Sequence, residues 1–249
     1  MQATVEEMER LLNKYRGILG PWPRATASDQ IGMIICDSGE AQSALPFFDL
    51  SLKLIAQSRP CSVKRDLDLL DARVKHHRAS AQFTLRRSHL DQENAFHMIQ
   101  ESGEIAELSH DIRRLALSKT AEAKMQHSLG NIETSAALVE EALSSKAHNN
   151  KWTNFLLYSL RARLYLEMGQ REAAVEDLKT SASLLDMHNM KPEHSLFDGF
   201  DPRYVLSQLD TGAGRLKDIS RTDTPQRKRR LPVERSTLSS LIQMLALGV

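Results

Sequence analysis

The sequence predicts an all-α protein made of helical hairpins, on three observations. Apolar residues recur at the three- and four-residue spacing of helices along most of the chain, and no run alternates apolar with polar residues as a strand does. Aromatic residues make up only 5% of the 249 residues, whereas β-sandwiches depend on them together with Val and Ile. Short turns that contain glycine separate the helical stretches.

The first predicted element is an amphipathic helix, whose apolar side is formed by Val5, Met8, Leu11, Leu12 and Tyr15. Glycines at 17 and 20 and the sequence PWP at 21–23 are typical of a helix end. We therefore expect residues 1–24 to form a capping helix and turn, with Trp22 sealing the first hairpin.

The next helices are expected at 27–37, 41–57, 64–88, 91–108, 110–128, 132–147, 151–168 and 171–188. Residues 191–219 are expected to form a loop and a short helix. Asp201 and Pro202 suit the N-cap and the first position of this helix, which would run to about Leu209.

Three of the predicted hairpins share a pattern around their turn glycines, Gly39, Gly130 and Gly169. Seven residues before each glycine stands a small residue; five, nine and twelve residues after it stand a small, a bulky apolar and a second small residue. These positions are Gly32, Ala44, Phe48 and Ser51 in the first hairpin, Ala123, Ser135, Val139 and Ala142 in the next, and Ala162, Ala174, Leu178 and Ser181 in the last. Small residues at such positions let paired helices approach closely, and the bulky residue fills the space between them.

This pattern resembles the 34-residue unit of the tetratricopeptide repeat (TPR) family. A fourth segment, 76–107, has Ala95, Ile99 and Ser102 in place but Leu90 at the glycine position. The position represented by Ala44 recurs at intervals of 51, 40 and 39 residues, which indicates helices longer than the family's own. The resemblance implies a right-handed superhelical array of about four antiparallel hairpins over 25–190, a TPR-like α-solenoid; a non-repetitive helical bundle is the alternative.

The resemblance also implies a concave face lined by the first helix of each hairpin. Its lining positions would be Asp29, Met33 and Cys36, then Thr120, Lys124 and His127, and finally Ser159, Arg163 and Leu166. Of these we expect Lys124, His127, Arg163 and Leu166 to contact a partner, with Lys124 and Arg163 at equivalent places facing an acidic group. The alternative is that both are ordinary solvated charges. The family's clamp for a chaperone tail needs Lys and Asn where this chain has Asp29 and Met33, so a different helix or an extended peptide is the expected ligand.

The net charge is +1, but the basic residues are unevenly distributed along the chain. Residues 215–235 hold eight basic and three acidic residues, whereas the rest of the chain holds 25 and 29. Residues 220–235 lack apolar periodicity and are expected to be a flexible linker. Its run of Arg227, Lys228, Arg229 and Arg230 could bind an import receptor or, weakly and without sequence preference, nucleic acid; a solvated tail is the alternative.

Residues 236–249 are predicted to form a short C-terminal helix. Its apolar stripe consists of Leu238, Leu241, Ile242 and Leu245. The stripe would cap the last repeat or form a contact in a homo-oligomer, or else be offered to the groove of another protein.

The sequence contains none of the common phosphate-binding, dinucleotide-binding, zinc-protease or serine-hydrolase motifs. The histidines at 76, 77, 89 and 97 do not complete a metal-ligand spacing, and Cys36 lacks a motif that would make it a nucleophile. We therefore expect no enzymatic activity and no cofactor. With two cysteines and no apolar stretch longer than 14 residues, the expected location is intracellular, cytoplasmic or nuclear, without a membrane partner.

The leading functional hypothesis is a non-enzymatic adaptor or scaffold that binds a peptide or helix of another protein in the concave face, within a multi-subunit complex or alone. A nuclear or nucleic-acid-associated regulator that uses residues 221–235 is the second hypothesis. A bacterial regulator or secretion chaperone of the TPR type is the third.

Overall fold

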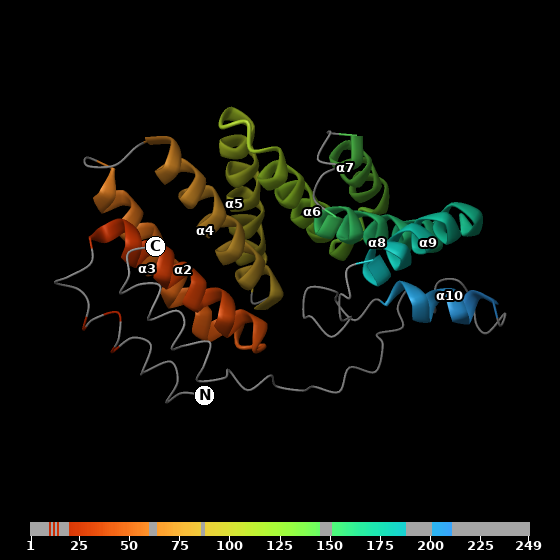
Figure 1. Ribbon diagram of the computed structural model, residues 1–249, viewed down its shortest axis with the longest axis horizontal. Helices are drawn as coiled ribbons and strands as arrows, with labels where there is room; N and C mark the ends of the chain where they lie inside the picture. The colour runs from red at the N-terminus through yellow and green to blue at the C-terminus, as the bar shows by residue number, and fades with distance from the viewer. Residues whose placement is uncertain are drawn as a thin grey trace. The chain divides into compact units, whose positions relative to one another are not determined.

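The computed structural model describes residues 10, 12, 14, 20–59, 64–85, 88–144, 151–187 and 201–210 (Figure 1). Every regular element in this part of the chain is an α-helix, which confirms the all-α prediction. The helices are α2 (Pro21–Asp37), α3 (Ala41–Ser58), α4 (Lys64–Leu85), α5 (His89–Leu108), α6 (Ile112–Ser128), α7 (Ile132–Ser144), α8 (Lys151–Glu167), α9 (Arg171–Met187) and α10 (Pro202–Asp210). No helix among these described elements is both long and apolar enough to cross a membrane.

The predicted helix bounds agree with these helices to within a few residues, except at the start of α2. This helix begins at Pro21 with Gly20 as its N-cap, so the PWP sequence opens α2 instead of closing the preceding helix. Proline suits the first helical turn because the N–H that it lacks has no partner there. The side chain of Trp22 is 45% exposed, so the prediction that it seals the first hairpin is wrong.

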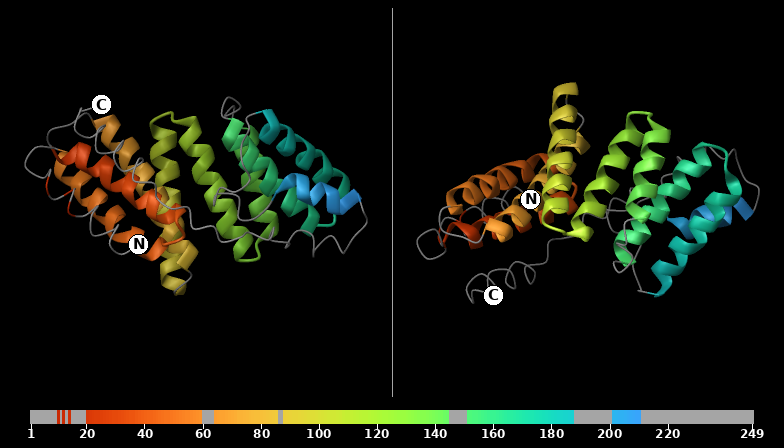
Figure 2. Two further views of the ribbon diagram at one scale, coloured as in Figure 1. Left: turned by 60° about the horizontal axis from the view of Figure 1, so that its bottom comes forward. Right: turned by 90° about the horizontal axis from the view of Figure 1, so that it is seen from above.

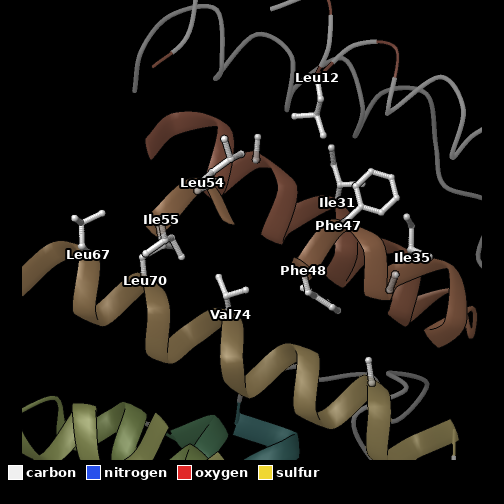
Figure 3. Packing of buried hydrophobic residues seen from close by; sticks show 14 residues of the cluster. Leu12, Ile31, Ile35, Phe47, Phe48, Leu54, Ile55, Leu67, Leu70 and Val74 are labelled. Atoms are coloured by element: carbon white, nitrogen blue, oxygen red, sulfur yellow. The ribbon is translucent and has the colours of Figure 1, made fainter. Parts of the chain in front are cut away.

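The chain divides into two compact units, one formed by the described residues up to Ser109 and the other by those from His110 onward. In the first unit, α2 packs on α3, α3 on α4 and α4 on α5, and α2 also contacts α4. Its core gathers large side chains from three helices, including Phe47, Phe48, Ile55 and Leu67 (Figure 3). Leu12, one of three described residues of the predicted N-terminal helix, also packs into this core.

In the second unit, α6 pairs with α7 and α8 pairs with α9 (Figures 1 and 2). The first helices of the two hairpins, α6 and α8, also contact each other. The short helix α10 packs on α9 and inserts Val205 and Leu209 among Ala162, Leu166 and Leu178. The second unit therefore joins two hairpins and closes one end with a helix that follows 15 residues after α9 in the sequence.

The turn glycines of three described hairpins adopt the left-handed conformation, with φ of 85° at Gly39, 86° at Gly130 and 77° at Gly169. Each turn has the same two backbone hydrogen bonds. Around Gly39, for example, Glu40 N–H donates to Ile35 O and Gly39 N–H donates to Cys36 O, which is the Schellman arrangement. A Cβ at any of the three glycines would meet no atom within 4 Å, so glycine is required by the backbone conformation and not by packing.

The residues of the predicted repeat pattern lie between the helices of each hairpin. All twelve small and bulky positions of the second helices are buried: Ala44, Phe48, Ser51, Ala95, Ile99, Ser102, Ser135, Val139, Ala142, Ala174, Leu178 and Ser181. All four serines in this set cross the hairpin, since their hydroxyls donate to carbonyl oxygens in the partner helix: Ser51 to Ala25 (2.8 Å), Ser102 to Ala72 (2.7 Å), Ser135 to Ala123 (2.7 Å) and Ser181 to Phe155 (3.5 Å). The repeated feature is thus a packing unit whose polar atoms are satisfied within the hairpin.

In the segment 76–107, Leu90 stands at the position of the turn glycine but lies inside α5, which begins at His89, whereas α4 ends at Leu85. The helix α4, which lies wholly between Ala44 and Ala95, has 22 residues, more than the 17 of α2, α6 and α8, and this contributes to the wide spacing. The superhelical, solenoid arrangement of the hairpins stays a prediction.

Candidate partner-binding site

The first lining position predicted in each hairpin faces the protein interior instead of a concave surface. Asp29, Thr120 and Ser159 are all buried. The Thr120 hydroxyl donates to Ala116 O at 2.7 Å, and the Ser159 and Ser181 hydroxyls share a hydrogen bond of 2.6 Å. The two hydroxyls are satisfied inside their hairpins, and Asp29 contacts Arg73 and His77 of α4, so none of the three side chains is available to a partner.

Leu166 also needs correction as a partner-contacting residue. It is fully buried and packs with Ala174 and Leu178 of α9 and with Val205 and Leu209 of α10. The sequence pattern around Leu166 could not show this, because α10 comes more than 30 residues later. The remaining predicted residues, Lys124, His127 and Arg163, are each partly exposed.

The structure brings His127 of α6 and Arg163 of α8 to the same carboxylate, that of Glu167. His127 Nε2 lies 2.9 Å from both Oε1 and Oε2 of Glu167. Arg163 Nε lies 3.7 Å from Oε1, one turn earlier on the same helix. Lys124 precedes His127 by three residues and therefore lies on the same side of α6. We call Lys124, His127, Arg163 and Glu167 the α6–α8 charge cluster.

Glu167 was missed by the sequence reasoning. Its spacing of four from Arg163 is typical of an ion pair along one helix and could have pointed to that contact. Nothing in the sequence could place it next to His127, 40 residues away, because that contact depends on how α6 and α8 pack.

The ends of the helices position this cluster. His127 lies in the last turn of α6, and Glu167 is the last residue of α8. The unpaired carbonyls at a helix C-terminus favour a cation and disfavour an anion, typically by about 0.3–1 kcal/mol. The Glu167 carboxylate at the end of α8 therefore depends on the neighbouring basic groups.

The helix α8 is held firmly by a second ion pair, on its side toward α9. Arg161 donates two hydrogen bonds to Asp177, from Nε to Oδ2 at 2.7 Å and from Nη2 to Oδ1 at 2.8 Å. Its guanidinium also lies over the rings of Tyr158 and Tyr165, 5.5 and 5.6 Å from their centroids. The hydrogen bonds to Asp177 raise the pKa of Arg161. Arg163 and Glu167 are thus carried by a helix that is fixed independently of them.

The first unit holds a similar set of charges between α2 and α4. Arg73 Nε of α4 donates a hydrogen bond to Asp29 Oδ2 of α2 at 2.8 Å. His77 Nδ1, also of α4, lies 2.8 Å from Asp29 Oδ1. Here the earlier helix, α2, carries the carboxylate and the later one, α4, carries the imidazole. In the second unit the earlier helix, α6, carries the imidazole and the later one, α8, carries the carboxylate. The side chain of Asp29 is 2% exposed and that of Glu167 is 13% exposed, so only the Glu167 carboxylate lies at the edge of its cluster.

Cys36, another predicted lining residue, packs partly buried against the core of the first unit. Desolvation, aided by the nearby charge of Asp37, raises the pKa of its thiol from 9.0 to about 12. The thiolate, which is the reactive form, is therefore scarce at neutral pH.

In a Cys61→Ser variant, the remaining Cys36 should react with iodoacetamide at pH 8 about 1000-fold more slowly than the same thiol in the denatured chain. The folded protein binds the Cys36 thiol proton more tightly than the unfolded chain does. The free energy of unfolding should therefore fall as the pH rises from 9 toward 12. Equal alkylation rates in native and denatured protein would contradict this prediction.

Among the described residues, no group of three or more His, Cys, Asp or Glu side chains is arranged to hold a metal ion. His76 and His77 place their rings edge to face with centroids 5.8 Å apart. The basic run Arg227–Arg230 and the stripe of Leu238, Leu241, Ile242 and Leu245 lie outside the described residues. Comparison of the chain with protein-family models, curated proteins and solved structures found no match.

Proposed function

We propose that this protein is a non-enzymatic adaptor that binds a peptide or helix of another protein along the first helices of its hairpins. The observation that carries the proposal is the α6–α8 charge cluster. It brings His127 of α6 and Arg163 of α8 to the carboxylate of Glu167, with Lys124 one turn before His127 on α6. A TPR-like superhelical arrangement and a concave binding face are parts of the same proposal.

The packing of the hairpins supports this function. Their second helices bury their small and bulky positions against the first helices, and the crossing serines satisfy polar atoms there. In the second unit, the partly exposed Lys124, His127 and Arg163 are thereby presented by helices that neighbouring helices hold in place. Charged groups held on rigid elements give a binding surface its orientation and specificity.

The proposal is tested with the full chain and a panel of fluorescent 15-residue peptides of varied acidic, basic and apolar composition. A double variant, Lys124→Ala with Arg163→Ala, should weaken binding of the selected peptides by about 5- to 30-fold, the loss of one or two strong contacts. Lys179→Ala is the control, because Lys179 is exposed on α9 and pairs only at 3.4 Å with Glu176. Equal affinities for the double variant, the control and the unchanged protein would refute the binding site.

The basic segment 221–235 favours a second function, weak binding to nucleic acid. Binding driven by phosphate contacts falls steeply with salt concentration and should be lost in a chain that ends at Ser220. Peptide binding at the α6–α8 charge cluster should survive that truncation.

A further inference from the structure

We propose that Glu167 occupies the site of an acidic side chain of the partner. On binding, a carboxylate of the partner replaces the Glu167 carboxylate at His127 and Arg163. This inference rests on the proposed function, since it names the chemistry of the ligand and a contact that opposes its binding. The expected partner is a peptide or helix with an Asp or Glu side chain in its recognised segment.

The first argument is that Glu167 leaves a hydrogen-bond donor of its basic neighbour Arg163 without an acceptor. Its two oxygens are equidistant from His127 Nε2, and the nearer of them lies 3.7 Å from Arg163 Nε. This Nε is buried and has no hydrogen-bond acceptor among the described residues. A guanidinium binds a carboxylate best through two parallel N–H···O bonds. A carboxylate that arrives from another chain is free to adopt this geometry, whereas Glu167 is tied to the same helix as Arg163.

The second argument is that Glu167 can leave its place at low cost. Its side chain has three rotatable bonds, is 13% exposed and stands at the very end of α8, where a negative charge is disfavoured. Asp29 in the first unit is the contrasting case. Its short side chain is almost fully enclosed and accepts both of its contacts at 2.8 Å. Of the two carboxylates, Glu167 is the replaceable one.

The third argument concerns the charge that remains when Glu167 moves away. The Arg163 guanidinium then loses its 3.7 Å neighbour, and His127 loses the carboxylate at 2.9 Å from its Nε2. A cluster of this kind recruits an anionic side chain and rejects a basic one. The partner's carboxylate must first displace Glu167, so Glu167 lowers the affinity for every anionic ligand by the same factor, and only a ligand whose other contacts offset this cost binds.

The experiment compares Glu167→Gln with the unchanged full chain, using acidic peptides from the panel and matched peptides in which Asn and Gln replace Asp and Glu. Removing the internal carboxylate should tighten binding of the acidic peptides by about tenfold and leave binding of the amide peptides unchanged. The matched control is Glu141→Gln. Glu141 belongs to the same unit, is 58% exposed and pairs with Lys119 at 2.8 Å, so the control removes the same charge elsewhere.

An equal gain in Glu167→Gln and Glu141→Gln would overturn the inference, because it would show a general effect of net charge. No gain in Glu167→Gln, together with weakened binding in the double variant of Lys124 and Arg163, would overturn it while the proposed function stands. Failure of every peptide to bind any form of the protein would overturn both. If Glu167→Gln does not fold, Glu167→Asp decides: it keeps the charge but shortens its reach, and it should still tighten binding of acidic peptides.

Discussion

Replacing Gly32 with alanine is expected to destabilise the first unit by about 1–3 kcal/mol. A Cβ on Gly32 would lie 2.6 Å from Cε1 and 2.8 Å from Cζ of Phe48, closer than non-bonded carbons approach, so the helices or the ring must shift. Phe48 is fully buried in the unit's core, where close packing opposes a shift of its ring. Inside a helix, alanine is normally more stabilising than glycine by about 1 kcal/mol. A loss of stability in Gly32→Ala would therefore point to the contact with Phe48.

Urea denaturation followed by circular dichroism measures the effect, with Phe48→Leu and the double variant as controls. Phe48→Leu alone should be destabilising, because it leaves part of the ring's volume empty. The smaller leucine should remove most of the clash, so the double variant should lose clearly less stability than the two single changes added together. A Gly32→Ala protein as stable as the unchanged chain would contradict the close approach of α2 and α3.

The features predicted correctly from the sequence are those that a few neighbouring residues determine. The turns at Gly39, Gly130 and Gly169 need a left-handed residue, and glycine supplies it without strain. The helix bounds follow from apolar periodicity in the same way. Where proline and glycine stand together, as at 20–23, the pattern is compatible with both a helix end and a helix start, and the structure has the start.

The candidate site was less predictable because it depends on contacts between distant segments. The pattern predicts Leu166 as a lining residue, but Leu166 packs with Ala174 and Leu178 of α9 and is covered by Val205 and Leu209 of α10. Asp29 is predicted to line the concave face, yet Arg73 and His77 of α4 both contact its carboxylate. Glu167 carries no signal for its contact with His127, because their helices meet only in the folded chain.

Breaking the charge set around Asp29 is the second change with a large expected effect. Asp29→Ala leaves the Arg73 guanidinium and the His77 ring without the carboxylate that both contact at 2.8 Å. Removing one partner of a buried ion pair typically lowers the free energy of unfolding by about 3–5 kcal/mol. Because Arg73 is partly exposed, we expect a loss of about 3 kcal/mol. The free energy of unfolding from urea denaturation measures the loss.

Asp49→Ala provides the matched control, since Asp49 also pairs with an arginine of α4, Arg78, at 2.6 Å but is 55% exposed. An exposed pair contributes about 0–1 kcal/mol, so the control should change stability little. Removing both partners in Asp29→Ala with Arg73→Met should restore part of the loss, because no unpaired guanidinium is then left between α2 and α4. Equal effects of Asp29→Ala and Asp49→Ala would show that burial adds nothing at Asp29. A large difference would instead establish Asp29 as a structural carboxylate and strengthen its contrast with the more exposed Glu167, whose equivalent contacts are proposed to be exchangeable.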